Sequence, residues 1–212
     1  NFKPDAALVA FDAGKVTFRT KMYDDYKGGR NKTPNELTEQ IPYVRELIKD
    51  SGLHSYELAN YEADDIIGTL AKQADDAGYK TLIVTGDRDL TQLASENTTV
   101  AVTHKGVTDT EHYTPAHVEE KLGITPRQII DMKALMGDSS DNYPGVTKIG
   151  EKTAIKLVKQ FGSVEELYDH IDDLKKSKMK EHLIEDEEVA RQCKTLATIL
   201  QDAPIKIGLD DL

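Results

Sequence analysis

Two short runs of apolar and β-branched residues stand out in the pattern of hydrophobic and polar positions. They cover residues 6–11 and 81–85, and a weaker run of the same kind covers residues 100–103. Such runs are typical of buried strands in a parallel sheet. An aspartate closely follows each strong run, Asp12 after the first and Asp87 after the second. Ligands of open α/β sheets gather beyond the carboxyl ends of the strands, so we expect Asp12 and Asp87 to converge there.

Between these runs, apolar residues recur at helical spacing. The pattern predicts helices over residues 36–50, 63–77, 115–122 and 125–137. In the second of these, the apolar stripe leaves Glu62 and Asp64 on opposite flanks and turns Asp65 away, so we place Glu62 in the preceding loop. Acids in a first helical turn are favoured by the helix dipole alone. The pattern by itself therefore leaves a structural and a functional role open for these three acids.

The composition limits the class of protein. At 212 residues the chain has room for one main domain and a helical extension. It is 38% hydrophobic and has no apolar run long enough to span a bilayer, so we expect no membrane association. The single Cys193 cannot form an internal disulfide, which favours a reducing cytoplasm.

The net charge of −11 is unusual for a protein that binds nucleic acid, but the charge is unevenly distributed. Residues 15–32 carry a local charge of +4, and residues 146–160 carry a local charge of +3. Tyr23 and Tyr26 lie in the first segment, where aromatic faces can stack unpaired bases while basic side chains follow the phosphates. The two segments are therefore candidate polyanion-binding patches.

Carboxylates gather in short clusters at the ends of the apolar segments. Together with Asp12, the set comprises Glu62, Asp64, Asp65, Asp87, Asp89, Asp138 and Asp141. So many acids would repel one another unless cations neutralised them. Hard oxygen ligands from several elements are what Mg²⁺ or Mn²⁺ sites use, with water and substrate phosphate completing the shell. The set therefore predicts a metal-dependent enzyme that acts on phosphate.

A glycine-containing turn follows the helix predicted over residues 125–137. Gly145 and Gly150 permit close approach of the backbone, and Lys148 and Lys152 supply charge beside exposed main-chain groups. This combination indicates a reader of the phosphate backbone. An ordinary connection between helices stays open as the alternative, because the spacing of the two glycines is a weak signal alone.

Five motifs, in their order and spacing, resemble those of the 5′-nuclease, or flap endonuclease, family. They are Phe11-Asp12-Ala13-Gly14, Tyr26-Lys27-Gly28-Gly29-Arg30, Tyr61-Glu62-Ala63-Asp64-Asp65, Thr85-Gly86-Asp87-Arg88-Asp89 and Gly137-Asp138-Ser139-Ser140-Asp141-Asn142. The turn at residues 145–154 follows them at the matching place. The likeness covers nearly the whole chain.

The resemblance implies roles for these residues. Asp12, Asp64, Asp87 and Asp89 would bind or directly support two or more metal ions, while Glu62, Asp65, Asp138 and Asp141 would hold metal-bound waters or supporting positions. Lys27 and Arg30 would be the basic catalytic pair at the base of a helical arch, in contact with the scissile phosphate. The expected DNA-binding residues are Lys15, Arg19, Tyr26, Gly145, Val146, Lys148, Ile149, Gly150, Lys152 and Thr153, with a K⁺ ion at the turn.

The implied fold is α/β, a PIN-like and mostly parallel sheet flanked by helices, followed by a helix-hairpin-helix subdomain. We expect the catalytic core over residues 1–135, with the arch region at about residues 14–35, and the DNA-binding helices over residues 136–212. The family's chain starts with a further strand that ends in a metal-binding aspartate, and this core lacks that strand.

The implied activity is metal-dependent hydrolysis of DNA in the 5′-3′ direction and at 5′ flaps, in Okazaki-fragment primer removal and DNA repair. The expected partners are duplex DNA with a flap or frayed 5′ end and a polymerase domain that follows in the same chain. We expect a monomer in the bacterial cytoplasm, associated with the nucleoid.

Three alternatives stay open. A haloacid-dehalogenase-like phosphatase would need a second aspartate two positions after Asp12, where Gly14 stands. A PIN-like ribonuclease for single strands would not need a turn that grips a duplex. A catalytically impaired DNA-binding fragment would follow from the lack of the first metal-binding strand.

Overall fold

In the part of the chain that the structure describes, five strands form two sheets whose strand ends position the acids. Strands β1 (Leu8–Phe11) and β2 (His54–Glu57) are parallel. In the second sheet, β3 (Thr81–Thr85) and β4 (Thr98–Thr103) are parallel, and β5 (Thr110–Tyr113) runs antiparallel to β4. The computed structural model describes residues 3–104 and 109–212 and keeps the two sheets separate within those ranges. The predicted α/β class with mostly parallel strands is confirmed.

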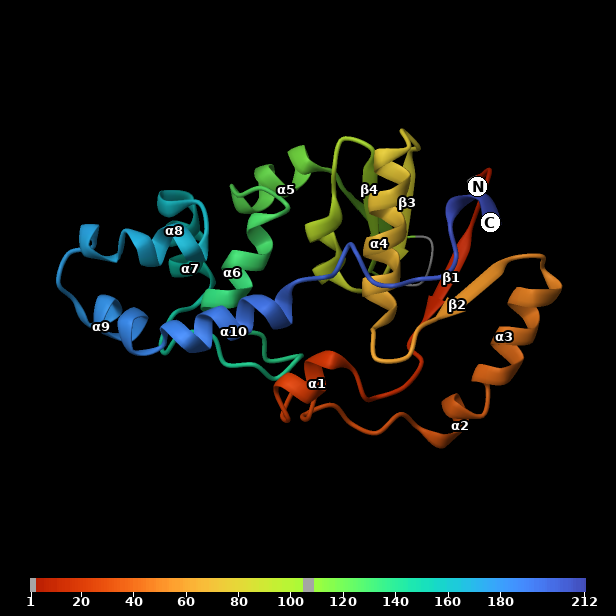
Figure 1. Cartoon of the computed structure of the whole chain (residues 1–212), viewed down its shortest axis with the longest axis horizontal. Helices are drawn as coiled ribbons and strands as arrows, with labels where there is room; N and C mark the ends of the chain where they lie inside the picture. The colour runs from red at the N-terminus through yellow and green to blue at the C-terminus, as the bar shows by residue number, and fades with distance from the viewer. Residues whose placement is uncertain (1–2, 105–108) are drawn as a thin grey trace.

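Helix α4 (Ala63–Asp76) connects the two sheets because it packs against both β1 and β3 (Figure 1). Its predicted apolar stripe is buried, including Ile66, Leu70 and Ala74. Gly68 lies against the main chain near the end of the protein, and a Cβ atom there would be 2.5 Å from the carbonyl oxygen of Leu200. The helix that carries the central acids is therefore packed on several sides.

The helix predicted over residues 36–50 is divided into α2 (Asn35–Thr38) and α3 (Ile41–Asp50). Pro42 lies in the first turn of α3, where its missing N–H costs no hydrogen bond, and this favours a new helix start there. The predicted arch region contains the short helix α1 (Phe18–Met22), followed by turns and irregular chain up to α2.

The second half of the chain is mainly helical. A 3₁₀ turn, η1 (Arg88–Leu93), follows β3, and the helices are α5 (Pro115–Leu122), α6 (Gln128–Met136), α7 (Glu151–Phe161), α8 (Val164–Asp169), α9 (Lys178–Glu185) and α10 (Glu187–Ala197). A second 3₁₀ turn, η2 (Ile171–Asp173), lies between α8 and α9. Helix α6 packs against both α7 and α10. Within the described ranges, no helix is long and apolar enough to cross a bilayer.

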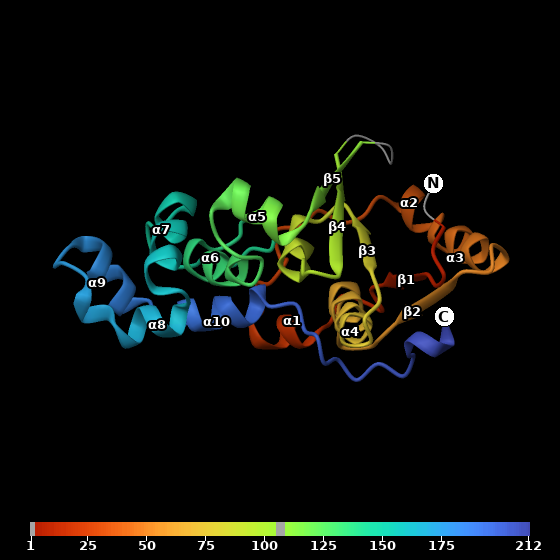
Figure 2. The same ribbon diagram turned by 90° about the horizontal axis from the view of Figure 1, so that it is seen from above.

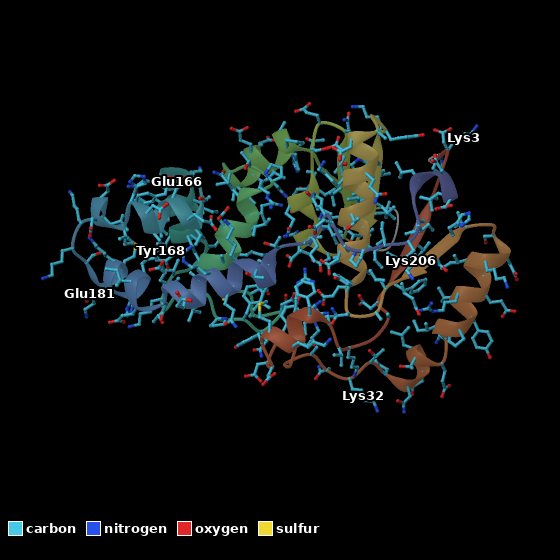
Figure 3. The ribbon with its side chains drawn as sticks, in the orientation of Figure 1. Lys3, Lys32, Glu166, Tyr168, Glu181 and Lys206 are labelled. Atoms are coloured by element: carbon cyan, nitrogen blue, oxygen red, sulfur yellow. The ribbon has the colours of Figure 1, made fainter. Side chains whose placement is uncertain are left out.

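The helical part and the β1–β2 pair occupy opposite ends of an elongated molecule (Figures 1 and 2). Figure 3 shows Glu166 on α8 and Glu181 on α9 at the helical end, and Lys3 and Lys206 at the other. The acids described below lie between these two ends, where β1, β3, α4 and the loop after α6 come together.

Residues 198–208, which we call the C-terminal strap, run from α10 across α4 toward β2 and end at η3 (Leu209–Asp211) (Figure 1). The backbone N–H of Leu200 donates to Asp65 Oδ1 at 3.0 Å, and that of Ala203 donates to Thr69 Oγ1 at 3.0 Å. The strap therefore holds the helical part and the sheet-containing core together.

Candidate active site

The first part of the site lies where β1 ends and α4 begins. The Oδ1 atom of Asp12 accepts a 2.8 Å hydrogen bond from the backbone N–H of Ala63 in the first turn of α4. Glu62 precedes the helix with an extended backbone, as predicted. Burial, followed by the nearby charge of Asp87, raises the pKa of Asp64 to about 7, and Asp12 adds to this shift. The ends of β1 and β3 therefore approach the start of α4.

The second part of the site follows β3. Asp87 is exposed and caps η1, because its Oδ1 accepts a 2.8 Å hydrogen bond from the backbone N–H of Asp89. A small hollow of about 10 Å³, close to the least space that holds a water molecule, lies beside these acids. Its lining includes Glu62, Asp64, Asp89, Asp141 and Tyr143.

The third part is the loop after α6. Oδ1 of Asp138 accepts hydrogen bonds from Ser140, at 2.7 Å from the backbone N–H and 2.6 Å from the hydroxyl. Burial opposes ionisation of Asp138, but hydrogen bonds from Lys133 and Ser140 lower its pKa to about 2. Asp141 is buried, and its Oδ1 lies 2.6 Å from a guanidinium nitrogen of Arg30.

Lys27 and Arg30 lie beside these acids, at the base of the predicted arch. The backbone N–H of Lys27 donates to the carbonyl of Asp141 at 2.8 Å, and Lys27 Nζ is 2.5 Å from Glu62 Oε1. Lys27 has a φ of +58°, a left-handed conformation that is costly for a lysine and that persists only where its surroundings enforce it. The fold thus brings the predicted catalytic pair together with the predicted metal ligands.

The acids of the site differ in how their charge is balanced. Among the described residues, Asp12, Asp64 and Asp87 have no basic side chain within ion-pair distance. The others are paired: Glu62 with Arg19 and Lys27, Asp89 and Asp138 with Lys133, Asp141 with Arg30, and Asp65 with Arg19. The negative charge that is not balanced by the protein is therefore concentrated at the ends of β1 and β3 and the start of α4.

The structure corrects the role expected for Arg19. Arg19 is only 2% exposed, and its guanidinium donates to both oxygens of Asp65, at 2.8 Å each, and to the carbonyls of Leu196 and Thr198. Asp65 is completely buried and also accepts from the backbone N–H of Glu62. Arg19 cannot reach a DNA phosphate here, so it is part of an internal brace rather than a DNA contact. The place of Asp65 in this brace fits the supporting position that the resemblance allows for it.

Tyr26 also differs from its expected role. Its ring is buried, 5% exposed, and its hydroxyl lies 3.1 Å from Asp141 Oδ2 and 3.2 Å from Glu62 Oε2. A buried ring has no face available for a DNA base, because the hydrophobic core and the two carboxylates already surround it. Tyr26 therefore positions Glu62 and Asp141 instead of stacking on DNA.

The turn before α7 has a packed side and an open side. Gly145 has a φ of +65°, and a Cβ atom there would lie 2.2 Å from the backbone nitrogen of Gly137, so this glycine serves packing against the end of α6. Val146 and Ile149 are buried, and their backbone N–H groups donate to Leu135 and Val146. These three residues anchor the turn from within, and the expected DNA contact does not come from their side chains.

The open side of the turn carries the other residues expected to contact DNA. Lys148, Gly150 and Lys152 are exposed, and Thr153 is half-buried. Gly150 precedes α7 without a capping side chain, and a Cβ atom there would meet nothing within 4 Å. The first N–H groups of α7 lack intrahelical acceptors, as at any helix start. Lys15, in the loop after β1, is exposed as well.

Sequence reasoning missed Lys133. It lies in α6 between Met132 and Ala134, and it contacts both Asp89 and Asp138. The only available signal was a lysine between the apolar residues Met132 and Ala134 of the helix. Its approach to Asp89 depends on how α6 packs beside η1.

The predicted metal ligands stay a prediction. In the described part of the chain, no three histidine, cysteine or acidic side chains stand close enough to hold one metal ion as they are placed. Two features fit a cation nevertheless. The acids supply hard oxygen donors, and the buried Tyr143 hydroxyl, which has no hydrogen-bond partner among those residues, lines the same hollow as Asp64 and Asp89.

Two family models match the chain. The model described as the N-terminal resolvase-like domain of 5′-3′ exonucleases matches residues 1–123, and the model of the C-terminal SAM fold matches residues 124–212. Their boundary lies earlier than the predicted division between residues 135 and 136. It places α6 with the C-terminal helices, in agreement with the packing of α6 on α7 and α10.

The relatives are bacterial DNA polymerases. The chain is 59% identical over 211 residues to the DNA polymerase I of Lactococcus lactis subsp. lactis (strain IL1403), and 59% identical over 210 residues to that of Bacillus subtilis (strain 168). Each alignment covers 99% of this chain and 24% of the relative, so the chain spans about a quarter of their length.

Two solved structures are similar. The T5 D15 protein, co-crystallised with metal ions, matches with a TM-score of 0.79 and 25% identity, over 91% of this chain and 75% of that chain. The catalytic core of Rad2 in complex with a DNA substrate matches with a TM-score of 0.58 and 19% identity, over 96% of this chain and 70% of that chain. The Rad2 match supports the fold alone.

Proposed function

The chain belongs to the 5′-3′ exonuclease family, and on this premise we propose that it hydrolyses DNA phosphodiester bonds at or near a 5′ end. The observation that carries the proposal is the approach of acids from β1, β3, α4 and the loop after α6 to Lys27 and Arg30. That arrangement combines negative charge for cations with positive charge for a phosphate in one place.

Divalent metal ions are part of the proposal. When bound, Mg²⁺ or Mn²⁺ would activate a water molecule and offset the charge that builds on the phosphate. The acids with no ion pair among the described residues, Asp12, Asp64 and Asp87, are the natural first ligands. The T5 D15 protein, which was co-crystallised with metal ions, supports this requirement.

Lys27 and Arg30 are proposed to hold the scissile phosphate. The Lys27 side chain is 23% exposed and the Arg30 side chain 52% exposed, so both can exchange a carboxylate for a phosphate oxygen without unfolding. Both basic groups would stabilise charge that develops on the phosphate. Glu62 and Asp141 hold them in place until DNA arrives.

The open side of the turn before α7 is proposed to grip the duplex. Lys148 and Lys152 would contact phosphates, and the exposed backbone at Gly150 allows a strand to approach closely. A K⁺ ion at this turn is proposed from the family resemblance. We further propose that Lys15, near the end of β1, contacts the strand that approaches the acids.

The substrate is proposed to be duplex DNA with a flap or frayed 5′ end, because unpaired terminal nucleotides expose the bond to the metals. In view of the DNA polymerase I relatives, a polymerase domain in the same protein is proposed, with roles in primer removal and repair. Such work would place a monomer in the bacterial cytoplasm, at the nucleoid.

A cleavage assay tests the proposal. The 212-residue chain is incubated with a 5′-flap DNA duplex in Mg²⁺, in Mn²⁺ and in EDTA. We expect cleavage only with a divalent ion, and its loss in Asp87→Asn. Asp172→Asn is the matched control, because Asp172 is an almost fully exposed acid in η2, outside the site. Cleavage in EDTA, or equal activity of Asp87→Asn and the control, would contradict the proposal.

The same assay separates the alternatives. Faster cleavage of single-stranded RNA than of flapped DNA would favour a PIN-like ribonuclease. Binding of flapped DNA without cleavage in either metal would favour a DNA-binding module. We favour the nuclease because both Lys27 and Arg30 are directed at the acids, an arrangement that DNA binding alone does not require.

A further inference from the structure

Lys133 is a positive charge built into the acid cluster. Its side chain is only 14% exposed, and its Nζ atom lies 2.5 Å from Asp138 Oδ2 and in direct contact with Asp89 Oδ1. The ammonium is therefore held between two acids that come from different elements.

A divalent ion cannot share this position with the ammonium. Mg²⁺ binds oxygen at about 2.0–2.1 Å, so an ion held by the facing oxygens of Asp89 and Asp138 would occupy the space of Lys133 Nζ. The two positive charges would also repel each other strongly at such a short distance in a partly buried site. Only one cation can use this pair of oxygens at a time.

Asp12, Asp64 and Asp87 are in a different position. Among the described residues, no basic side chain lies within ion-pair distance of these three acids, whereas the acids around them are paired. A cation can approach these three acids without displacing an ion-paired side chain. The site is therefore divided into a half whose acids have no direct ion pair and a half already occupied by a lysine.

We propose that Lys133 is the resident counter-ion of the Asp89–Asp138 pair, and that a divalent ion binds this pair only by displacing the lysine ammonium. The chain then has two classes of metal site, a tighter one at Asp12, Asp64 and Asp87 and a weaker one controlled by Lys133. This inference rests on the proposed metal-dependent function and adds a residue that sets the metal affinity.

Manganese titration tests the inference directly. Free Mn²⁺ is measured by electron paramagnetic resonance while Mn²⁺ is added to the wild-type chain, to Lys133→Met and to Lys133→Arg. Methionine keeps the length and removes the charge, whereas arginine keeps the charge. We expect the weaker site to tighten by about tenfold or more in Lys133→Met, because a nearby like charge is removed, and to stay weak in Lys133→Arg.

Lys194→Met is the matched control. Lys194 also pairs with two acids, 2.6 Å from Asp131 and 2.5 Å from Glu165, and its side chain is 24% exposed. Both methionine variants should melt at a lower temperature in EDTA, because each removes the lysine that pairs with two acids. Saturating Mn²⁺ should restore the melting temperature of Lys133→Met to a much greater extent than that of Lys194→Met.

Several outcomes would overturn the inference. One is a Mn²⁺ binding isotherm of Lys133→Met that is unchanged from the wild type, or that shows weaker Mn²⁺ binding. Another is an equal recovery of the melting temperature by Mn²⁺ in both methionine variants. If Lys133→Met did not fold, the test would rest on Lys133→Arg. A weaker site that bound Mn²⁺ more tightly in Lys133→Arg than in the wild type, or no second site in that variant, would count against the inference as well. Two classes of Mn²⁺ site in a chain that cleaves no flapped DNA would refute the proposed nuclease and leave the role of Lys133 intact.

Discussion

Replacing Arg19 by methionine should strongly destabilise the protein. The place of Arg19 in a basic segment suggests instead an exposed side chain whose replacement costs little. Methionine keeps the length and apolar stem of the side chain but removes every guanidinium hydrogen bond. Asp65, completely buried, would lose its counter-ion, and the carbonyls of Leu196 and Thr198 would lose a donor. Breaking a buried pair by removing one partner costs about 3–5 kcal/mol, a large part of a typical stability of about 5–15 kcal/mol.

Urea unfolding followed by circular dichroism measures this loss. The control is Arg45→Met, which breaks one ion pair between two partly exposed side chains, Arg45 and Glu57, and should cost about 0–1 kcal/mol. The double variant Arg19→Met/Asp65→Asn should be less destabilised than the sum of its single variants, because it leaves no buried charge unpaired.

The opposite result has a clear meaning. If Arg19→Met unfolded at the urea concentration of the wild type and bound DNA more weakly, Arg19 would contact DNA as its place in the basic segment first indicated. The conclusion that Arg19 forms an internal brace between α1, α4 and α10 would then be wrong.

Three further predictions concern the site and the turn. Lys27→Ala should slow cleavage by about 100-fold and weaken DNA binding much less, and equal losses in rate and affinity would contradict its role. Gly145→Ala should cost more than about 1 kcal/mol in urea unfolding because of the positive φ and the contact with Gly137, whereas Gly150→Ala should leave stability within about 1 kcal/mol of the wild type. Asp64 keeps its proton up to about pH 7 in the folded chain but loses it near pH 4 in the unfolded chain. In EDTA, the melting temperature should therefore fall as the pH rises from about 4 to 7, and Asp64→Asn should reduce this slope. An unchanged slope would contradict the raised pKa of Asp64.

Local patterns predicted the parts of the fold that depend on neighbouring residues. The stripe of α4 was recognised because its burial repeats along the chain. The run of β3 was recognised by its apolar and β-branched residues, although only Ile83 of this strand is buried and Val84 is exposed. Strands β2 and β5 were missed, since each has only four residues and they carry His54 and Glu57, or Glu111 and His112, at positions where apolar residues mark a strand.

The site was predictable where it follows strand ends and helix starts, and not where it depends on distant packing. Asp12, Asp64 and Asp87 are positioned by the elements next to them. The roles of Arg19, Tyr26 and Lys133 are set by partners that lie 177, 115 and 44 residues away in sequence. A basic or aromatic residue looks the same in sequence whether it faces DNA or the interior, so only the tertiary structure separates the two.

The C-terminal strap also sets an order of events during synthesis on the ribosome. Asp65 and Thr69 accept hydrogen bonds from residues that are made 135 and 134 positions later. At about 5–20 residues per second, this delay is on the order of ten seconds. Throughout that time, the nascent polypeptide contains α4 but lacks the backbone N–H groups that donate to Asp65 and Thr69. The surroundings of Asp65 and Thr69 would therefore be completed only after Leu200 and Ala203 have been translated.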